Sequence, residues 1–325
     1  MGLKNVITRP KFIIYSLLIL ALLFLPRILS TFNLILFEYG LTFAIAVLGF
    51  NLLLGYTGLL SFGHGAFFAA GAYGVAMIAK YFPGLYAMEI LIPGALLLSL
   101  IVSAIFGFLC VRHTKIFFAI LALALSMLVY ALVFKFYHIT GGSDGLYVKV
   151  PHMFGMTFEG TRRPQFLSGI YYYFLLGVFV GSFIIMKGIV SSPFGKALQA
   201  IRDNELRAEL IGIRVRRYRL YAFIISGMFT GLGGALWSFI NGHVTPDVSH
   251  WVFSGEIVYM TLLGGFAILE GPIIGAMIFT FLKLYAMGST EYWMFIIGLT
   301  LIILVLLLPT GIAGGFKKLA DRITG

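Results

Sequence analysis

Charged residues are scarce in this sequence, and so are the residues that build catalytic and metal sites. Asp, Glu, Lys and Arg make up 11% of the 325 residues, against about 25% in typical soluble domains. The single cysteine, Cys110, excludes an intrachain disulfide and a cysteine metal cluster. No Gly-x-x-x-x-Gly-Lys-Ser/Thr or His-Glu-x-x-His pattern occurs. We therefore expect neither an enzyme nor a chain that binds a nucleotide, cofactor or metal.

Apolar residues are abundant instead. They make up 60% of the chain, and the mean hydropathy is +1.02. No soluble core could enclose so much apolar surface, so we expect an all-α polytopic membrane protein with one transmembrane domain over residues 1–325. The net charge of +11 comes mostly from residues beside apolar segments, which is a topology signal and argues against a nucleic-acid partner.

The predicted membrane spans follow from the length of the apolar segments, since a span needs about 20 residues. The segments rich in glycine, around 59–80 and 251–287, leave the count open between ten spans and eight or nine spans with re-entrant pieces. We thus predict about 8–10 transmembrane helices with discontinuous segments. The ten candidates are residues 12–29, 34–54, 59–80, 88–111, 116–137, 170–189, 219–240, 251–268, 272–287 and 291–308.

The positive residues predict the orientation. With a cytoplasmic N-terminus and an uncleaved first span, most of the 23 Lys and Arg residues fall on the cytoplasmic side. Both termini are then cytoplasmic. A loop at about 138–169 lies outside, where it is large enough for a lid or docking surface, and a loop at about 190–219 lies inside. The exceptions to the charge pattern are Arg27, Lys80, Lys135, Lys149, Arg162, Arg163 and Lys283.

The inner loop is the most polar part of the chain, and its pattern predicts a short amphipathic helix over about 193–211. Ser192 before Pro193 is a typical helix start, and Gly212 is in a position typical of a helix stop. Leu198, Ile201, Leu206 and Leu210 recur near helical spacing. Two roles fit such a helix: a membrane-surface element that sets topology, or a coupling element that docks on a soluble partner.

The stretch 55–74 combines many glycines with almost no charge. Glycine loosens a helix, and in hydrocarbon this is tolerated only where other helices bury the segment or where it lines a wet cavity. We therefore predict a translocation path or discontinuous segment at Gly55, Ser61, Gly63 and His64. For His64 alone, a packed neutral imidazole is favoured over a ligand or proton relay. The pairs Gly227/Gly231 and Gly271/Gly275 predict close helix packing within the chain.

Ionisable residues within the predicted spans are few. Glu38, Lys135 and Lys283 lie near outer ends, where they can reach the interface, whereas Glu256 is harder to place there. An ion-coupled carrier would be expected to have a series of buried carboxylates, and the sequence has none. This counts against a self-sufficient channel or carrier.

Five ordered motifs resemble those of one family. They are Gly55-Tyr-Thr-Gly-Leu-Leu-Ser-Phe-Gly-His-Gly-Ala-Phe-Phe-Ala-Ala-Gly-Ala-Tyr, Thr140-Gly-Gly-Ser-Asp-Gly-Leu, Ser192-Pro-Phe-Gly-Lys-Ala-Leu-Gln-Ala-Ile-Arg-Asp-Asn-Glu, Leu262-Leu-Gly-Gly-Phe with Glu270-Gly-Pro-Ile-Ile-Gly-Ala, and Pro309-Thr-Gly-Ile-Ala-Gly-Gly. Together they resemble LivM-type permeases of branched-chain amino acid ABC transporters, over nearly the whole chain.

The resemblance implies a subunit of an ATP-driven importer for leucine, isoleucine and valine in a prokaryotic inner membrane. Its partners would be a second related permease, two cytoplasmic ATPase subunits that hold ATP and Mg, and an extracytoplasmic binding protein. Similar importers for urea and short amides, or for nucleosides and sugars, remain alternatives.

The inner loop resembles the family's coupling segment for the ATPase. The general importer motif, Glu-Ala-Ala followed by a glycine, survives here only as Ala208 and Gly212, which leaves the detailed contacts open. The residues that the resemblance places in the ATPase-coupling loop are Gly195, Ala197, Arg202, Asp203, Glu205, Ala208 and Gly212.

Overall fold

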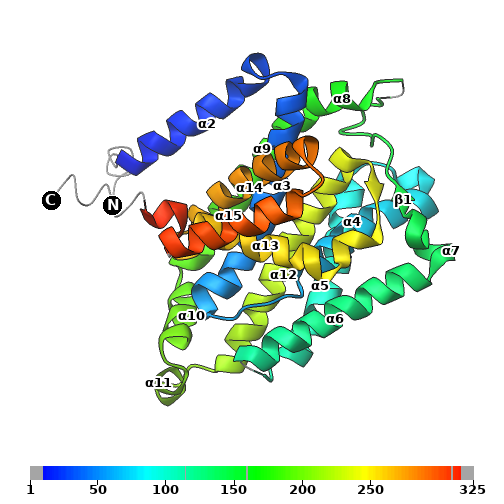
Figure 1. Ribbon diagram of the computed structural model, residues 1–325. Helices are drawn as coiled ribbons and strands as arrows, with labels where there is room; N and C mark the ends of the chain where they lie inside the picture. The colour runs from blue at the N-terminus through cyan, green and yellow to red at the C-terminus, as the bar shows by residue number, and fades with distance from the viewer. Residues whose placement is uncertain (1–9, 114, 159, 309, 316–325) are drawn as a thin grey trace.

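The computed structural model describes residues 10–113, 115–158, 160–308 and 310–315, and it is a bundle of helices (Figure 1). Each predicted apolar segment contains a helix. The helices are α2 Pro10–Ile28, α3 Thr31–Thr57, α4 His64–Tyr81, α5 Met88–Cys110, α6 Lys115–Lys135, α9 Tyr172–Ser191, α12 Val215–Asn241, α13 Trp251–Gly264, α14 Gly271–Ser289 and α15 Trp293–Leu307.

Six helical segments in the described part of the chain are long and apolar enough to cross a membrane, which confirms the all-α polytopic class. The helices α13 and α15 are apolar but shorter, so these two segments are not full-length spans by themselves. The chain ends, including the predicted cytoplasmic Lys4, Arg9, Lys317, Lys318 and Arg322, lie outside the described residues, as does Pro309.

Short elements connect the long helices. The outer loop contains α7 (Tyr137–Thr140), the 3-10 turn η2 (Gly142–Asp144), strand β1 (Leu146–Tyr147), α8 (Arg163–Phe166) and the π-helix η3 (Leu167–Tyr171). The 3-10 turn η1 (Pro83–Leu85) follows α4, and strand β2 (His243–Val244) and the 3-10 turn η4 (Pro246–Ser249) follow α12. Strands β1 and β2 pair antiparallel, with Leu146 opposite Val244, which ties the outer loop to the end of α12.

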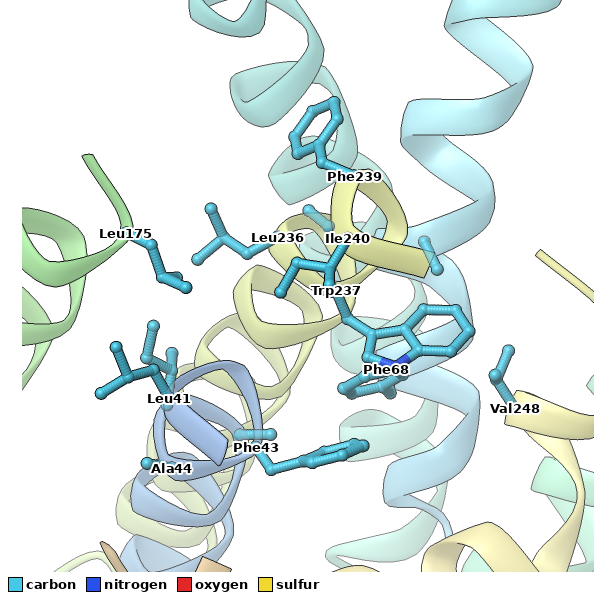
Figure 2. Close-up of a cluster of buried hydrophobic side chains, with 14 of the residues drawn as sticks. Leu41, Phe43, Ala44, Phe68, Leu175, Leu236, Trp237, Phe239, Ile240 and Val248 are labelled. Carbon is cyan, nitrogen blue, oxygen red and sulfur yellow. The ribbon is translucent and has the colours of Figure 1, made fainter. Parts of the chain in front are cut away.

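The helices α3, α4 and α12 form the centre of the bundle. Figure 2 shows Phe43 of α3, Phe68 of α4 and Trp237 of α12 lying together, with ring centroids 5.8 Å apart for the first two and 5.7 Å for Phe68 and Trp237. Stacked and edge-on aromatic pairs of this kind pack large surfaces in a defined geometry. The core therefore lies where three predicted spans cross.

Glycines set how closely these helices approach. A Cβ atom on Gly71 of α4 would overlap the carbonyl oxygen of Gly231 in α12, and one on Gly234 would overlap that of Phe68. A Cβ on Gly275 of α14 would likewise overlap the Met260 carbonyl of α13. The structure thus confirms that the glycine pairs allow close packing within the chain. In lipid there is no hydrophobic driving force between helices, so they associate where small residues let their backbones approach closely.

Contacts between loops agree with the predicted sidedness. The Tyr81 hydroxyl donates to the carbonyl of His138 at 2.9 Å, and the Tyr86 hydroxyl donates to that of Lys149 at 2.6 Å. All four residues lie in loops or helix ends assigned to the outside. Burial raises the pKa of Tyr86 to about 12, so its hydroxyl stays protonated and keeps donating at neutral pH. In Figure 1 the inner helices α10 and α11 lie on the opposite side of the bundle from β1 and α8.

Three local expectations were wrong. The helix predicted from residue 59 begins only at His64, because Gly58 takes a left-handed conformation (φ 71°) that ends α3. The inner loop forms two helices, α10 (Pro193–Asp203) and α11 (Glu205–Leu210), because Asn204 is extended and its side chain caps α11. Glu38 was expected near an interface but is fully buried.

The glycine contacts between α4 and α12 generate the first prediction. Gly71→Ala forces the two backbones apart, and overpacking of this kind costs about 1–3 kcal/mol. The variant should melt several degrees below the wild type in detergent. The control is Gly181→Ala on α9, where an added Cβ meets nothing within 4 Å and alanine favours the helix by up to about 1 kcal/mol. Equal melting temperatures for the two variants would contradict the packing assignment.

Candidate functional site

The junction between α3 and α4, residues 58–63, is the non-helical part of the glycine-rich segment. Gly58 has positive φ, and the amide of Leu59 donates to the carbonyl of Leu53 at 3.2 Å. A left-handed glycine with this back-bond is the usual way to end a helix while satisfying its last carbonyls. The sequence breaks the helix here because glycine reaches this conformation without strain.

Beyond the junction, His64 opens α4 and is fully buried. Its Nδ1 lies 3.1 Å from the Ser61 hydroxyl and its Nε2 lies 2.7 Å from the Ser226 hydroxyl. The rings of Phe50 and Phe67 pack edge-on against it at 4.8 and 5.2 Å. Both ring nitrogens are therefore occupied, as a neutral, packed imidazole requires, and the side chain connects α4 to α12.

The four residues predicted for the path all lie in the packed interior. Gly55, Ser61, Gly63 and His64 are buried, and a Cβ on Gly63 would lie 2.8 Å from the carbonyl oxygen of Ala122. Their neighbours in sequence, in contrast, face a hollow of about 530 Å³ between the junction and α6. Its lining comprises Gly58, Leu60, Phe62, Ile116, Ala119, Ile120 and Leu123.

The inner helices α10 and α11, which we call the hairpin, are attached to the junction. The guanidinium of Arg202 in α10 donates to the carbonyl of Gly55, near the C-terminal end of α3. The Cγ of Arg202 would also lie 3.1 Å from a Cβ on Gly58. The last carbonyls of a helix have no partner within it, so Arg202 satisfies one of them and joins the predicted coupling loop to the predicted path segment.

A second attachment joins the hairpin to α12. Glu205 receives two hydrogen bonds from Arg219, at 2.7 and 2.9 Å. The Arg219 side chain is only 6% exposed, while that of Glu205 is 40% exposed. Paired, two-point contacts between carboxylate and guanidinium fix relative orientation as well as distance. The hairpin is thus held by α3 on one side and by α12 on the other.

The remaining predicted coupling residues divide by exposure. Gly195 and Ala208 are buried and Ala197 is half-buried, whereas Asp203 and Gly212 are exposed. Of the four apolar residues that recur near helical spacing, Leu198 and Ile201 are buried, whereas Leu206 and Leu210 are exposed. The exposed apolar residues at the end of the hairpin are Leu206 (73%), Leu210 (86%) and Ile211 (74%).

The sequence did not predict the ion pair between Glu256 and Lys283. Lys283 of α14 lies 2.6 Å from one carboxylate oxygen of Glu256 in α13 and 2.7 Å from the other. Opposite charges on two consecutive apolar segments joined by a glycine-rich turn would have been the signal. Within the part of the chain that the structure describes, no group of three or more His, Cys, Asp or Glu side chains could hold a metal ion.

Comparison with known proteins gives consistent matches. The family described as "branched-chain amino acid transport system / permease component" matches residues 32–305. The permease protein LivM of the high-affinity branched-chain amino acid transport system of Escherichia coli (strain K12) is 28% identical, over 96% of this chain and 80% of that protein.

Two further relatives are more distant or cover less. The permease protein LivH of the same kind of system in Salmonella typhimurium is 23% identical, over 85% of this chain and 92% of that protein. The guanosine ABC transporter permease protein NupQ of Bacillus subtilis is 31% identical, but over only 28% of this chain and 27% of that protein. No solved structure gives a significant match.

Proposed function

This chain belongs to the family of branched-chain amino acid transport system permease components, and we propose that it is the membrane gate of an ATP-driven importer for leucine, isoleucine and valine. The family and the six long apolar helices make it a multi-pass membrane protein and a transport subunit. Relatives in bacterial branched-chain amino acid systems support this cargo and an inner-membrane location. The short match to a guanosine permease does not favour nucleosides.

The proposed partners are a second related permease, two cytoplasmic ATPase subunits and an external binding protein. Similarity to both LivM and LivH supports a pair of related permeases, since the two relatives carry different names in the same kind of system. The exposed Leu206, Leu210 and Ile211 at the end of the hairpin support a soluble partner on the inside. An apolar surface of this kind is typical of a helix that inserts into a groove on another protein.

The observation that carries the mechanism is the bond from Arg202 to the Gly55 carbonyl. Closure of an ATPase pair around ATP would displace the hairpin, and this contact would pass the displacement to the end of α3 and the junction. The helices would then rock and open the path to the other side. The chain itself supplies no ATP chemistry in this scheme.

The path itself we place beside the junction, at Gly55, Ser61, Gly63 and His64. What supports this is the hollow lined by Gly58, Leu60 and Phe62, which are neighbours of these buried residues in the sequence. Since the four residues are packed in this structure, the path at this level is closed, and a displacement of the junction would open it.

The cargo is tested by reconstituting the complete complex into vesicles and measuring uptake of labelled leucine, urea and ribose with and without ATP. We expect ATP-dependent uptake of leucine alone. Vesicles that hold only this chain serve as the control and should show no flux. Flux through the chain alone would contradict the gate and support a channel or carrier, and uptake of urea or ribose would reassign the cargo.

Coupling through the hairpin predicts the effect of Arg202→Gln. Losing a charge-assisted hydrogen bond costs about 1.5–3 kcal/mol, so leucine uptake should fall by about tenfold or more while the complex still assembles. The matched control is Arg207→Gln, an exposed residue of α11, which should transport normally. Wild-type uptake by the Arg202→Gln complex would show that this bond does not transmit the motion.

Docking through the hairpin predicts a different defect for Leu206→Gln with Leu210→Gln. Both side chains are exposed, so the fold should be kept and the melting temperature of the subunit should change little. The amount of ATPase that copurifies with the subunit should fall strongly, whereas Glu209→Gln in the same helix should leave it unchanged. Full copurification with the leucine variant would exclude this surface as the docking site.

A further inference from the structure

A second hollow lies on the outer half of the bundle, between α3, α12, α13, α14 and the start of α15. It has a volume of about 540 Å³, within the range of about 300–1,000 Å³ that is usual for small-molecule sites. Asn241, Thr245, Asp247 and His250, at the end of α12 and in the connection to α13, form its polar rim. This connection is on the predicted outer side, which is the side from which an importer receives its substrate.

The ion pair of Glu256 and Lys283 lines this hollow. The two side chains are 15% and 24% exposed, and the Lys283 ammonium also lies 5.6 Å from the ring centre of Trp293. A largely buried ion pair seldom adds stability over well-packed apolar residues. Ionisable residues within membrane helices therefore point to a functional site.

We propose that this hollow binds a zwitterionic α-amino acid, with Lys283 contacting the carboxylate and Glu256 contacting the ammonium group. The proposal rests on the amino-acid importer proposed above and places the substrate within it. The ion pair carries one charge of each sign, and so does the ligand; the second carboxylate of the lining, Asp247, lies in the rim, where it accepts a hydrogen bond from Thr245 at 3.2 Å. A zwitterion can therefore enter without leaving an unbalanced charge at membrane depth, whereas an amine or a carboxylate alone would leave one.

The rest of the wall fits an aliphatic side chain. Phe43 and Trp237, which Figure 2 shows beside Phe68, form one side of the hollow, and Met287 and Met294 contribute flexible apolar surface. The polar groups deeper in the wall already have partners. Tyr39 donates to Asn241 at 3.0 Å, and Thr280 donates to the Ala276 carbonyl at 2.7 Å.

The direct contact between Glu256 and Lys283 also limits affinity. An incoming ligand must replace this contact with its own two charges, so its net gain is small. Weak binding suits a site on a transport path, because a substrate held tightly at this point would not move on. Specificity at this site comes from the charge pattern and the apolar wall together.

The chain carries its own probe of this hollow. All three tryptophans, Trp237, Trp251 and Trp293, lie in its wall or within one residue of its lining. Titrating leucine into the purified full-length chain in lipid nanodiscs should give a saturable change in tryptophan fluorescence. Isoamylamine and 4-methylpentanoate each carry one of leucine's two charges. Their affinity should be lower than that of leucine by a factor of about ten or more, as expected for one lost charge-assisted hydrogen bond.

The decisive variant is Glu256→Met with Lys283→Met, which removes both charges and keeps the side chains long and apolar. Lys80→Met, at a lysine outside this hollow, is the control. We expect the double variant to melt near the wild-type temperature and to lose the fluorescence response to leucine. Its rate of leucine import should fall by a factor of about ten or more. A pair that only fastens α13 to α14 would show none of these losses, because the apolar replacement keeps the helices packed.

The outcomes separate this site from the proposed function. ATP-dependent leucine uptake at the wild-type rate by the double-variant complex, or no saturable leucine response in the wild-type chain, would overturn the site and leave the importer standing. A wild-type complex that imports no leucine would overturn the importer, and the fluorescence titration would still decide the site. Equal responses to leucine and isoamylamine would overturn the zwitterion assignment.

Discussion

Backbone contact between α4 and α12 at Gly71, Gly231 and Gly234 is the constraint on which the other features of this bundle depend. Within a bilayer the lipid tails are as apolar as the side chains, so helices associate through close packing rather than through exclusion of water. The contact at these glycines allows no Cβ on either side. It sets the distance between α4 and α12, and thereby the positions of the elements that they carry.

The contacts of His64 with Ser226 and of Phe68 with Trp237 depend on this close approach. His64, at the start of α4, reaches Ser226 of α12 only because the two helices lie so close. Phe68 and Trp237 meet for the same reason, and Trp237 lines the outer hollow. The geometry of the junction at the inner end and that of the hollow at the outer end thus both depend on the contact between α4 and α12.

The sequence predicted the number and approximate position of the helices because apolar length is a local property. Helix ends were less predictable, since they depend on single residues such as Gly58, which stops α3, and Asn204, which splits the hairpin. The sequence did not indicate the burial of Glu38, and only the opposite charges on two consecutive segments pointed to the pairing of Glu256 with Lys283. Such contacts depend on how each helix is rotated about its own axis, which hydropathy alone does not specify. The path residues remain a prediction from the glycine-rich pattern, and the coupling residues remain a prediction from resemblance.

Helix α12 gives the protein a continuous strut from one face of the membrane to the other. Its 27 residues extend about 40 Å at about 1.5 Å per residue. At the inner end Arg219 holds Glu205 of the hairpin, and beyond the outer end β2 pairs with β1. A displacement at either end would therefore be transmitted along α12 to the other end. Because such linkage is reciprocal, a protein that settles on the outer loop would alter the hairpin as directly as the hairpin alters the outer loop.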